Sequence, residues 1–376
     1  MTFIPVLKPR VADANIMLPH IRMIDDACCY TNHGPQERML RTQFAAALGD
    51  RAVQEISLYS SGTAALIGAM QAWNLPAGTK CLVPAWTFIG SACAVAQAGL
   101  EPVIVDVDPE SWAIDPDVIE EMATDQNIKA CLIVSPFGAT VPYPELSDIQ
   151  ERTGMQILVD GAASFDFVHK LAETRLDLPV PLMVSLHATK LVSSIEGGMV
   201  VTSNADMTRR MISWSNFGIF DDDPVTQIGT NAKLSEIHAA YGQHSLTSWP
   251  EIRQTLLTIA DGYVEQITAR LPDIAFAPNI REGMVSSSFN IILPKPFPQL
   301  GHQLAANGIG TRRWWKDGVH RFPAFKSYAA GPLPVTEDLA ARTIGLPFYV
   351  GMTSDTVETV VAALETALAD QSVSAG

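Results

Sequence analysis

The sequence predicts an α/β fold: a three-layer α/β/α large domain with a mostly parallel seven-stranded sheet, followed by a smaller α+β domain at the C-terminal end. Two observations lead to this fold class. Between residues 55 and 202, seven short apolar or β-branched runs alternate with longer helix-like patterns, which is typical of βαβ units. Beyond residue 270 the alternation stops, and a distinct section with one strand and two helices follows.

Each run has an expected place in the fold. The predicted strands cover residues 55–58, 80–83, 102–106, 130–135, 156–160, 182–185 and 199–202. The predicted helices between them cover residues 63–73, 88–98, 115–124 and 144–153, and helix-like periodicity continues through 233–270. In the final section we predict a strand at 287–293, helices at 297–307 and 354–369, and a frayed tail at 370–376. We place the domains at 1–245 and 246–376, with the residues before about 50 lying over the small domain or the site.

Composition narrows the class of function. Of the 376 residues, 47% are hydrophobic and 17% are charged, which is enough for a large core. A formal net charge of −15 argues against nucleic acid and against a polybasic membrane anchor, so small-molecule chemistry is favoured. No apolar run approaches the roughly 20 residues that span a bilayer, and no signal-peptide pattern is found, so we expect a cytoplasmic protein. The five cysteines form no CxxC pair, which predicts buried thiols and no metal site.

A candidate anion site follows the first predicted strand. Ser61, Gly62, Thr63 and Ala64 open a helix there. Hydroxyl groups and free backbone N–H groups at a helix N-terminus favour a phosphate. The alternative is an ordinary helix cap with a turn glycine. Because the segment is neither GxGxxG nor a Walker motif, it does not indicate a nucleotide-binding fold.

Two charged residues stand at or just after the ends of apolar strands. Asp160 ends one strand, where a buried carboxylate needs a cationic partner such as a protonated ring nitrogen. An Asx-turn with Gly161 is the alternative. Lys190 comes five residues after the strand end at Ser185. Desolvation there would lower the pKa of the lysine and make it a candidate Schiff-base amine, whereas the alternative is a solvated surface lysine.

These three elements, in this order, resemble the aspartate-aminotransferase fold (fold type I) of pyridoxal-phosphate (PLP) enzymes. More narrowly, the chain resembles the DegT/StrS-type family of PLP-dependent nucleotide-sugar aminotransferases. The resemblance covers nearly the whole chain. The segments that carry it are 30–35 (YTNHGP), 61–66 (SGTAAL), 84–88 (PAWTF), 105–108 (VDVD), 160–163 (DGAA), 185–190, 196–198 (EGG), 229–231 (GTN), 235–236 (SE), 308–311 (GIGT), 320–325 and 346–347 (LP).

The resemblance implies roles at the cofactor. Lys190 would hold PLP as a Schiff base and would then act as the general acid/base that moves a proton between Cα and C4′. Asp160 would pair with the pyridine nitrogen and keep it protonated. Phe88 would stack on the ring. As alternatives, Phe88 is an ordinary core residue or the neighbouring Trp86 serves in its place.

The resemblance also implies a phosphate pocket shared between subunits. Gly62, Thr63, the backbone N–H of Ala64 and Ser185 would hold the phosphate from one chain. Asn231 would complete the pocket from the neighbouring subunit, which implies a homodimer with both active sites at the interface. The alternative for Asn231 is an N-cap of the helix expected to begin at residue 233.

Residues of the final section match the family's sugar site. Trp315 and His320 would line the sugar, and Arg312 and Arg313 would supply positive charge for a diphosphate or carboxylate. A solvated basic loop is the alternative for the two arginines. Nearer the cofactor, His187 is expected to be structural and Glu196 to fix its loop.

Three departures from the family pattern fall near the site. Ala163 stands where the family usually has Gln or His near the cofactor's phenolic oxygen, and the neighbouring Ser164 is expected to face another way. Phe137 lies in a Ser-Pro-Phe-Gly segment that replaces a His-Leu-Tyr-Gly type. Ile195 stands where Gly is usual. These departures leave the cofactor frame intact and point to an unusual acceptor.

The resemblance therefore implies a PLP-dependent aminotransferase of the kind used in polysaccharide biosynthesis. Such an enzyme moves an amino group from glutamate or glutamine to a keto sugar by ping-pong transamination. In most of the family the keto sugar is linked to a nucleotide. The first rival is a PLP-dependent sugar dehydratase, but those relatives replace the lysine with histidine, and Lys190 is present. The second is a non-catalytic PLP-fold binding or regulatory protein, against which the set of Lys190, Asp160 and Ser185 argues. A nicotinamide oxidoreductase would need a glycine fingerprint after its first strand, and the sequence lacks it.

Overall fold

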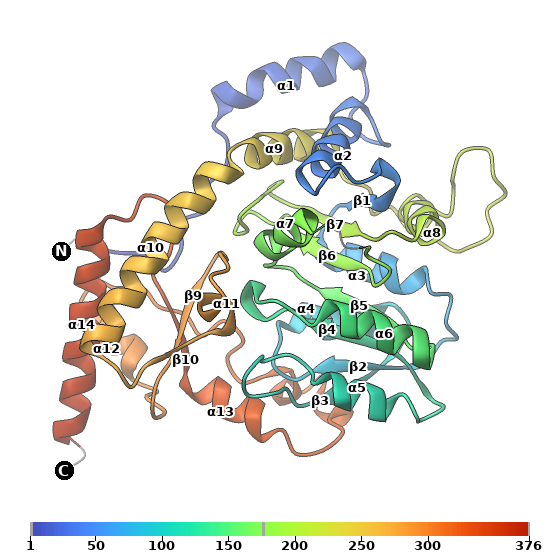
Figure 1. The fold of residues 1–376 in the computed structure, drawn as a ribbon. Helices are drawn as coiled ribbons and strands as arrows, with labels where there is room; N and C mark the ends of the chain where they lie inside the picture. The colour runs from blue at the N-terminus through green and yellow to red at the C-terminus, as the bar shows by residue number, and fades with distance from the viewer. Residues whose placement is uncertain (1–2, 175–176, 375–376) are drawn as a thin grey trace.

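The computed structural model describes residues 3–174 and 177–374, and its centre is a seven-stranded sheet (Figure 1). The strands are β1 (Ile56–Tyr59), β2 (Lys80–Pro84), β3 (Glu101–Val105), β4 (Ile128–Val134), β5 (Gln156–Asp160), β6 (Leu182–Ser185) and β7 (Gly198–Val201). Their order is β1-β7-β6-β5-β4-β2-β3. Strand β7 is antiparallel to β1 and β6, whereas the pairings among β2 to β6 are parallel. The predicted fold class is confirmed, and each strand begins and ends within two residues of its predicted bounds.

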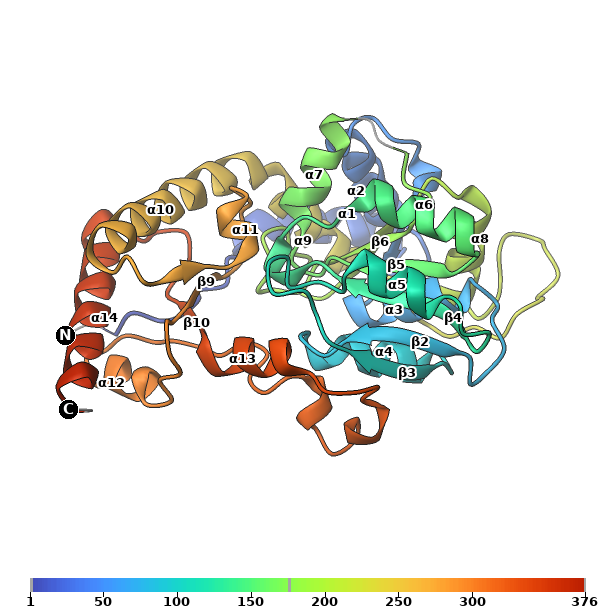
Figure 2. The ribbon, with the colours of Figure 1, turned by 60° about the horizontal axis from the view of Figure 1, so that its bottom comes forward.

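Helices cover both faces of this sheet. One face carries α2 (Pro35–Ala47), α5 (Pro116–Met122), α6 (Tyr143–Thr153) and α7 (Phe165–Glu173), and the other carries α3 (Gly62–Gln71), α4 (Ile89–Gln97) and α8 (Ala205–Ser215). Figure 2 shows α6 and α7 on one side of the sheet and α4 on the other. Successive strand side chains point to opposite faces, so Ile157 and Val159 join the core under α6, whereas Leu158 joins the core under α3. This alternation produces the predicted three layers.

The C-terminal part of the chain surrounds a second, smaller sheet. Strands β8 (Ala275–Phe276), β9 (Phe289–Ile292) and β10 (Thr343–Leu346) are antiparallel in the order β10-β9-β8. The helices after the large sheet are α9 (Glu236–Thr247), α10 (Trp249–Arg270), α11 (Pro278–Arg281), α12 (Leu300–Ala306), α13 (Pro334–Arg342) and α14 (Ser354–Ser374). Helix α14 packs against α10 and α12 (Figure 1). The predicted α+β character of this part is confirmed, while the domain boundary at residue 245 stays a prediction.

The first 50 residues divide between the two parts. Ile4 pairs with Ile309 in the C-terminal part. The chain then passes α10 and reaches α1 (Ala14–Ala27), which packs with α2 against α9 (Figure 1). The beginning of the segment therefore lies over the C-terminal part, as predicted, whereas α2 covers the large sheet and α1 packs outside it on α9.

Several elements differ from the prediction. The helical stretch 233–270 is two helices. Pro250 lies in the first turn of α10, where its missing backbone N–H needs no acceptor, and it could not donate a hydrogen bond within one continuous helix. The elements that were not predicted are helices α1, α2, α7, α8, α11 and α13 and the short strands β8 and β10. Helix α14 continues to Ser374, so residues 370–374 are helical rather than frayed, and the predicted tail at 375–376 lies outside the described residues.

The cysteine prediction is only partly correct. Cys81 and Cys131 are buried, and burial raises the pKa of both thiols. Cys29 and Cys93 are half-buried, and Cys28 is exposed, because it follows α1 in a left-handed cap that faces solvent. In the described part of the chain, no helix combines the length and the hydropathy needed to cross a membrane.

Candidate active site

Three predicted site residues lie at the carboxyl ends of two neighbouring parallel strands. Asp160 is the last residue of β5 and Ser185 is the last residue of β6. Lys190 lies on the loop that joins β6 to β7. In an open α/β sheet, ligands bind at the carboxyl ends of the strands, so the strand order alone brings these residues to one site.

The carboxylate of Asp160 is buried and hydrogen-bonded on both oxygens. It is 5% exposed, and it accepts a 2.7 Å hydrogen bond from the hydroxyl of Ser91 and a 3.1 Å bond from the N–H of Ala162. Burial raises the pKa of Asp160, while these two donors and the charge of Lys190 act in the opposite direction. The Asx-turn considered as an alternative is present, because Asp160 accepts from the N–H two residues later. This turn does not exclude the predicted role, because the same buried carboxylate also interacts with the charge of Lys190.

Lys190 is a partly buried amine rather than a solvated surface charge. Burial lowers its pKa, and the negative charge of Asp160 only partly restores it. Its loop is closed by hydrogen bonds from the Lys190 N–H to the carbonyl of His187 at 2.8 Å and from the Ala188 N–H to the carbonyl of Ile195 at 2.7 Å. A lysine with a lowered pKa is neutral more often and is a better nucleophile.

The loop geometry agrees with the structural roles expected of His187 and Glu196. The Nδ1 atom of His187 accepts the N–H of Thr189 at 3.3 Å, and its Nε2 atom lies 3.7 Å from Glu196. Ile195 has a φ of 66°, in the left-handed region where a β-branched side chain is strained. A glycine would adopt this backbone without strain, which explains in physical terms why glycine suits the position.

The N-terminus of α3 faces the end of β6. Ser61 caps the helix by accepting the N–H of Ala64 at 3.1 Å. The N–H groups of Gly62 and Thr63 have no acceptor within the helix, as is general for the first helical residues. A Cβ added to Gly62 would lie 3.4 Å from the hydroxyl oxygen of Ser185. The helix N-terminus and the Ser185 hydroxyl therefore meet in one place that suits an anion.

Phe88 is exposed beside this anion site. Its side chain is 61% exposed, and a Cβ added to Gly90 would lie 3.0 Å from the phenyl ring and 3.8 Å from the hydroxyl of Thr63. The alternative that Phe88 is an ordinary core residue is therefore wrong. Trp86, the other alternative, is 2% exposed and lies edge-on to Trp112 with the ring centroids 6.1 Å apart. Of the two rings, Phe88 is the one open to a ligand.

Asn231 lies on an exposed loop before α9. That helix begins at Glu236, and its N-cap is Ser235, whose hydroxyl accepts the N–H of His238 at 3.4 Å. The alternative that Asn231 caps the helix is therefore wrong. The same loop exposes apolar side chains, with Val225 at 60% and Ile228 at 93%. An exposed apolar loop of this kind is typical of a protein–protein contact.

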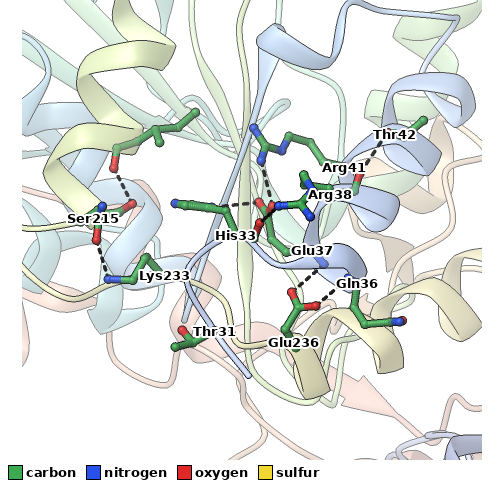
Figure 3. Close-up of polar contacts among 12 residues, drawn as sticks. Thr31, His33, Gln36, Glu37, Arg38, Arg41, Thr42, Ser215, Lys233 and Glu236 are labelled. Carbon is green, nitrogen blue, oxygen red and sulfur yellow. Dashed lines mark hydrogen bonds and ion pairs between the residues drawn. The ribbon is translucent and has the colours of Figure 1, made fainter. Parts of the chain in front are cut away.

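The Asn231 loop is fixed to the N-terminal part of the chain by the residue that begins α9. The carboxylate of Glu236 is fully buried and accepts the N–H of Gln36 at 2.6 Å and the N–H of Glu37 at 3.0 Å (Figure 3). Figure 3 shows this carboxylate pointing at the first turn of α2, where a helix dipole favours negative charge. The backbone N–H of Glu236 also donates to Tyr30 at 3.2 Å. The sequence contained no signal for this long-range cap.

The two predicted arginines differ in their surroundings. Arg312 is exposed, with its guanidinium 4.9 Å from the centre of the Trp314 ring. Arg313 is half-buried and donates to the backbone carbonyls of Ala340 at 3.0 Å and Phe297 at 3.4 Å. The guanidinium of Arg312 is thus the one available to an anion.

Trp315 and His320 both lie at the contact between the two parts of the chain. Trp315 stacks on Phe137 with the ring centroids 4.0 Å apart, and it is half-buried. His320 is 8% exposed, because the N–H of Val319 donates to Ala85 and holds this turn against the loop after β2. Burial, and then the charge of Arg321, lower the pKa of His320, so its imidazole is neutral at pH 7.

The missing side chain at Ala163 is not replaced by its neighbour. Ser164 is fully buried, and its hydroxyl lies 2.5 Å from the hydroxyl of Ser135, on the loop after β4. It therefore faces away from the site, as the sequence indicated. The residue that sequence reasoning missed is Ser91, since a serine in the first turn of an apolar helix carries no signal of a partner 69 residues away.

Pyridoxal phosphate has three parts that a protein must hold: an aldehyde, a ring nitrogen and a phosphate. The amine of Lys190, the buried carboxylate of Asp160 and the α3 N-terminus with Ser185 suit these parts in turn, and the Phe88 ring is open to stack. The donor set therefore fits the cofactor. Together with the mostly parallel seven-stranded sheet, it defines the class of fold type I PLP enzymes.

The chain belongs to the DegT/DnrJ/EryC1/StrS aminotransferase family, which its sequence matches over residues 14–365. It is 27% identical to the dTDP-4-amino-4,6-dideoxy-D-glucose transaminase of Shigella dysenteriae, over 96% of this chain and 97% of that protein. It is 28% identical to the dTDP-4-dehydro-2,3,6-trideoxy-D-glucose 4-aminotransferase of Saccharopolyspora spinosa, over 87% and 88% of the two chains. The structure of DesI in the presence of its TDP-sugar product superposes with a TM-score of 0.87, at 26% identity over 100% of this chain and 95% of that one. The predicted family, enzyme class and cofactor are thereby confirmed.

Proposed function

We propose that the protein transfers an amino group from glutamate or glutamine to a nucleotide-linked keto sugar, by ping-pong transamination with PLP. The observation that carries this proposal is the electrostatic interaction between two groups: the partly buried amine of Lys190, whose pKa is lowered by burial, and the buried carboxylate of Asp160 at the end of β5. The names of the relatives from Shigella dysenteriae and Saccharopolyspora spinosa support a sugar nucleotide as the acceptor.

Asp160 would control the electronics of the site. When bound, PLP supplies an electron-accepting ring that stabilises negative charge at the substrate carbon after a proton leaves it. The charged carboxylate of Asp160, held by Ser91 and the Ala162 N–H, would keep the ring nitrogen protonated. A neutral residue at this position would leave the ring less able to accept charge.

Lys190 would first anchor the cofactor and then move the proton. Its amine would also be the base that takes the proton from the Cα of the amino donor and holds it for return. A lowered pKa favours the neutral amine, which is the form that can accept the proton. The same residue argues against the dehydratase alternative, in which histidine stands at this position.

The phosphate would be bound by groups from two subunits. One chain would supply the free N–H groups of Gly62 and Thr63 and the hydroxyl of Ser185. The N–H of Ala64, which was also expected to bind the phosphate, is not available because it donates to Ser61. We propose that the second chain supplies Asn231, which makes the functional unit a homodimer. The exposed position of Asn231, on a loop that also exposes Ile228, supports this arrangement.

The acceptor would lie between Phe88 and the C-terminal part. We propose that the free guanidinium of Arg312 attracts the diphosphate and that Trp315 and His320 line the sugar. The guanidinium of Arg313 donates to backbone carbonyls, so Arg313 would attract the anion through its charge and would not contact it directly. Ala163 leaves the cofactor's phenolic oxygen without the usual side-chain partner. We therefore expect the acceptor to fill part of the space that this side chain occupies in most of the family.

A scan of amine donors against keto sugars, with the product identified by mass spectrometry, tests this function. The expected product is an amino sugar about 1 Da heavier than the keto sugar, because the change from C=O to CH–NH2 replaces one oxygen by one nitrogen and three hydrogens. It should form with glutamate or glutamine as the donor. Purified protein with PLP should show a visible absorbance band that borohydride abolishes and that tags Lys190. Lys190→Ala should lose transamination, whereas Lys295→Ala, at an exposed lysine, should retain it. Turnover that survives in Lys190→Ala would exclude this assignment.

A further inference from the structure

A groove opens beside Lys190 and is bounded by the N-terminal segment. Lys8 and Arg10 line it from that segment, and Lys190 lines it from the loop after β6. The remaining walls come from α10 and from the residues that follow β10. Of the residues that line this groove, only Lys190 has been given a role above.

The N-terminal segment is held in place by its backbone. Ile4 donates to Gly308 at 2.8 Å and accepts from Gly310 at 2.8 Å. Two residues later, the carbonyl of Val6 accepts the N–H of Phe348 at 3.0 Å. A Cβ added to Gly310 would lie 2.9 Å from the Val6 nitrogen, so the contact is close. The segment is thus anchored just before Lys8 and Arg10.

The groove is positively charged in an acidic protein. Lys8, Arg10 and Lys190 line it, and no Asp or Glu is among the described residues that do so. Lys8 and Arg10 are exposed, and within the described part of the chain neither makes a side-chain hydrogen bond or an ion pair. Two uncompensated cations beside the reactive lysine, in a chain with a net charge of −15, favour a small anion.

The other lining residues limit the kind of anion. Ile252 and Leu256 of α10, with Leu7 and Phe348, give the groove an apolar wall. A short methylene chain that ends in a carboxylate matches an apolar wall with cations at its edge. This is the chemistry of a dicarboxylic amino acid, whereas a nucleoside diphosphate would bring a base and a ribose for which this wall offers little hydrogen bonding.

We propose that Lys8 and Arg10 form the carboxylate-binding site for a dicarboxylic amino donor. The proposal rests on the aminotransferase function proposed above, since it gives the donor a site separate from the cations near the sugar. Lys8 and Arg10 bind and orient the donor, and the chemistry stays at Lys190.

The test uses the PLP-loaded full-length protein and the variants Lys8→Ala, Arg10→Ala and the double variant. Succinate, a dicarboxylate that cannot react, is titrated by calorimetry at low salt. Each single variant should weaken succinate binding about fivefold to tenfold, and the double variant more, because exposed charged hydrogen bonds contribute less than buried ones. The half-saturation for glutamate in the first half-reaction should rise by a similar factor with its limiting rate unchanged.

The matched control is Lys295→Ala, which removes an exposed charge that does not line the groove. It should leave succinate binding unchanged. Equal succinate affinity in all the variants would overturn the proposal, as would a selective loss of UDP or dTDP binding. Because succinate binding needs no turnover, it decides this proposal even if the wild-type protein aminates no sugar. Unchanged visible absorbance and melting temperature would show that the variants are folded and loaded.

Discussion

Ser91 in the first turn of α4 donates a 2.7 Å hydrogen bond to Asp160 at the end of β5. The hydroxyl of Thr87 lies 2.8 Å from that of Ser91 and is free to donate to it. A chain of two hydroxyls thus ends on the buried carboxylate and stabilises its charged form. Burial raises the pKa of Asp160, and these donors act in the opposite direction, toward the charged form that the proposed mechanism needs.

Ser91→Ala should make the enzyme slower and more sensitive to acid. Loss of the donor raises the pKa of Asp160 further, so the acidic limb of the pH–rate profile should move to higher pH. A hydrogen bond to a charged group contributes about 1.5–3 kcal/mol, so the rate at neutral pH should fall roughly tenfold or more. Ser91→Thr keeps the hydroxyl and should restore both properties. An acidic limb that does not move in Ser91→Ala would show that Ser91 only fills space.

The strand ends could be predicted from sequence, but Ser91 could not. Asp160 and Ser185 each close an apolar run, and parallel strands bring such ends together whatever lies between them. Ser91, by contrast, meets Asp160 only through the packing of α4 on the sheet, which no local pattern encodes. The same holds for Glu236, whose carboxylate caps a helix 199 residues earlier in the chain.

Phe88 and Trp86 show a second limit of sequence reasoning. Both rings flank the same short segment, and their types do not reveal which faces solvent. The structure separates them because Trp86 enters a buried aromatic cluster, whereas Phe88 caps α4 and remains 61% exposed. Tertiary packing decides which of the two rings is buried, so the sequence alone could not show which one is open to a ligand.

Gly198→Ala should weaken cofactor binding. Gly198 begins β7, and an added Cβ would lie 2.5 Å from the carbonyl oxygen of Ser61 and 2.8 Å from the nitrogen of Gly62. These are backbone atoms, so the α3 N-terminus must shift. We expect the PLP dissociation constant, measured by absorbance, to rise about tenfold or more, since loss of an anion contact of this kind costs about 1.5–3 kcal/mol.

The matched control for Gly198→Ala is Gly262→Ala on α10. A Cβ at Gly262 meets no atom within 4 Å. Alanine has the better helix propensity, so this variant should be more stable by up to about 1 kcal/mol and should bind PLP normally. Normal PLP affinity in Gly198→Ala would contradict the proposed phosphate pocket.

Ile228→Asp should shift the proposed dimer toward monomer. The side chain is 93% exposed in the single chain, three residues before Asn231, and a charge there would be costly to bury between subunits. Light scattering should report a lower mass at low protein concentration, and PLP should be lost in parallel because each pocket lacks the Asn231 of its partner. Ile228→Val retains an apolar side chain and should remain dimeric. A monomeric Ile228→Asp protein that binds PLP as tightly as the wild type would show that the phosphate pocket does not need Asn231 of a second subunit.

The pair Lys190 and Asp160 should cost stability in the absence of cofactor. Burial lowers the pKa of one and raises the pKa of the other, so the folded state disfavours both charges. The double variant Lys190→Met with Asp160→Asn should therefore unfold at higher denaturant concentration than the wild-type apoprotein at pH 7, by up to about 4 kcal/mol. Each single change should gain less, because it leaves the other charge without its partner.

The pH dependence of this gain has a definite sign. The carboxyl of Asp160 is neutral in both folded and unfolded chains below its ordinary pKa of 3.8, so its share of the gain should vanish as the pH falls toward that value. Lys190 is neutral in both states above 10.5, and its share should vanish there. Denaturant unfolding of the apoproteins at acidic, neutral and alkaline pH should give the largest difference near neutrality, with transamination abolished in the double variant. A double variant less stable than the wild type at pH 7 would show that attraction between the two charges outweighs their burial, and that the site is held together by the groups that carry out its chemistry.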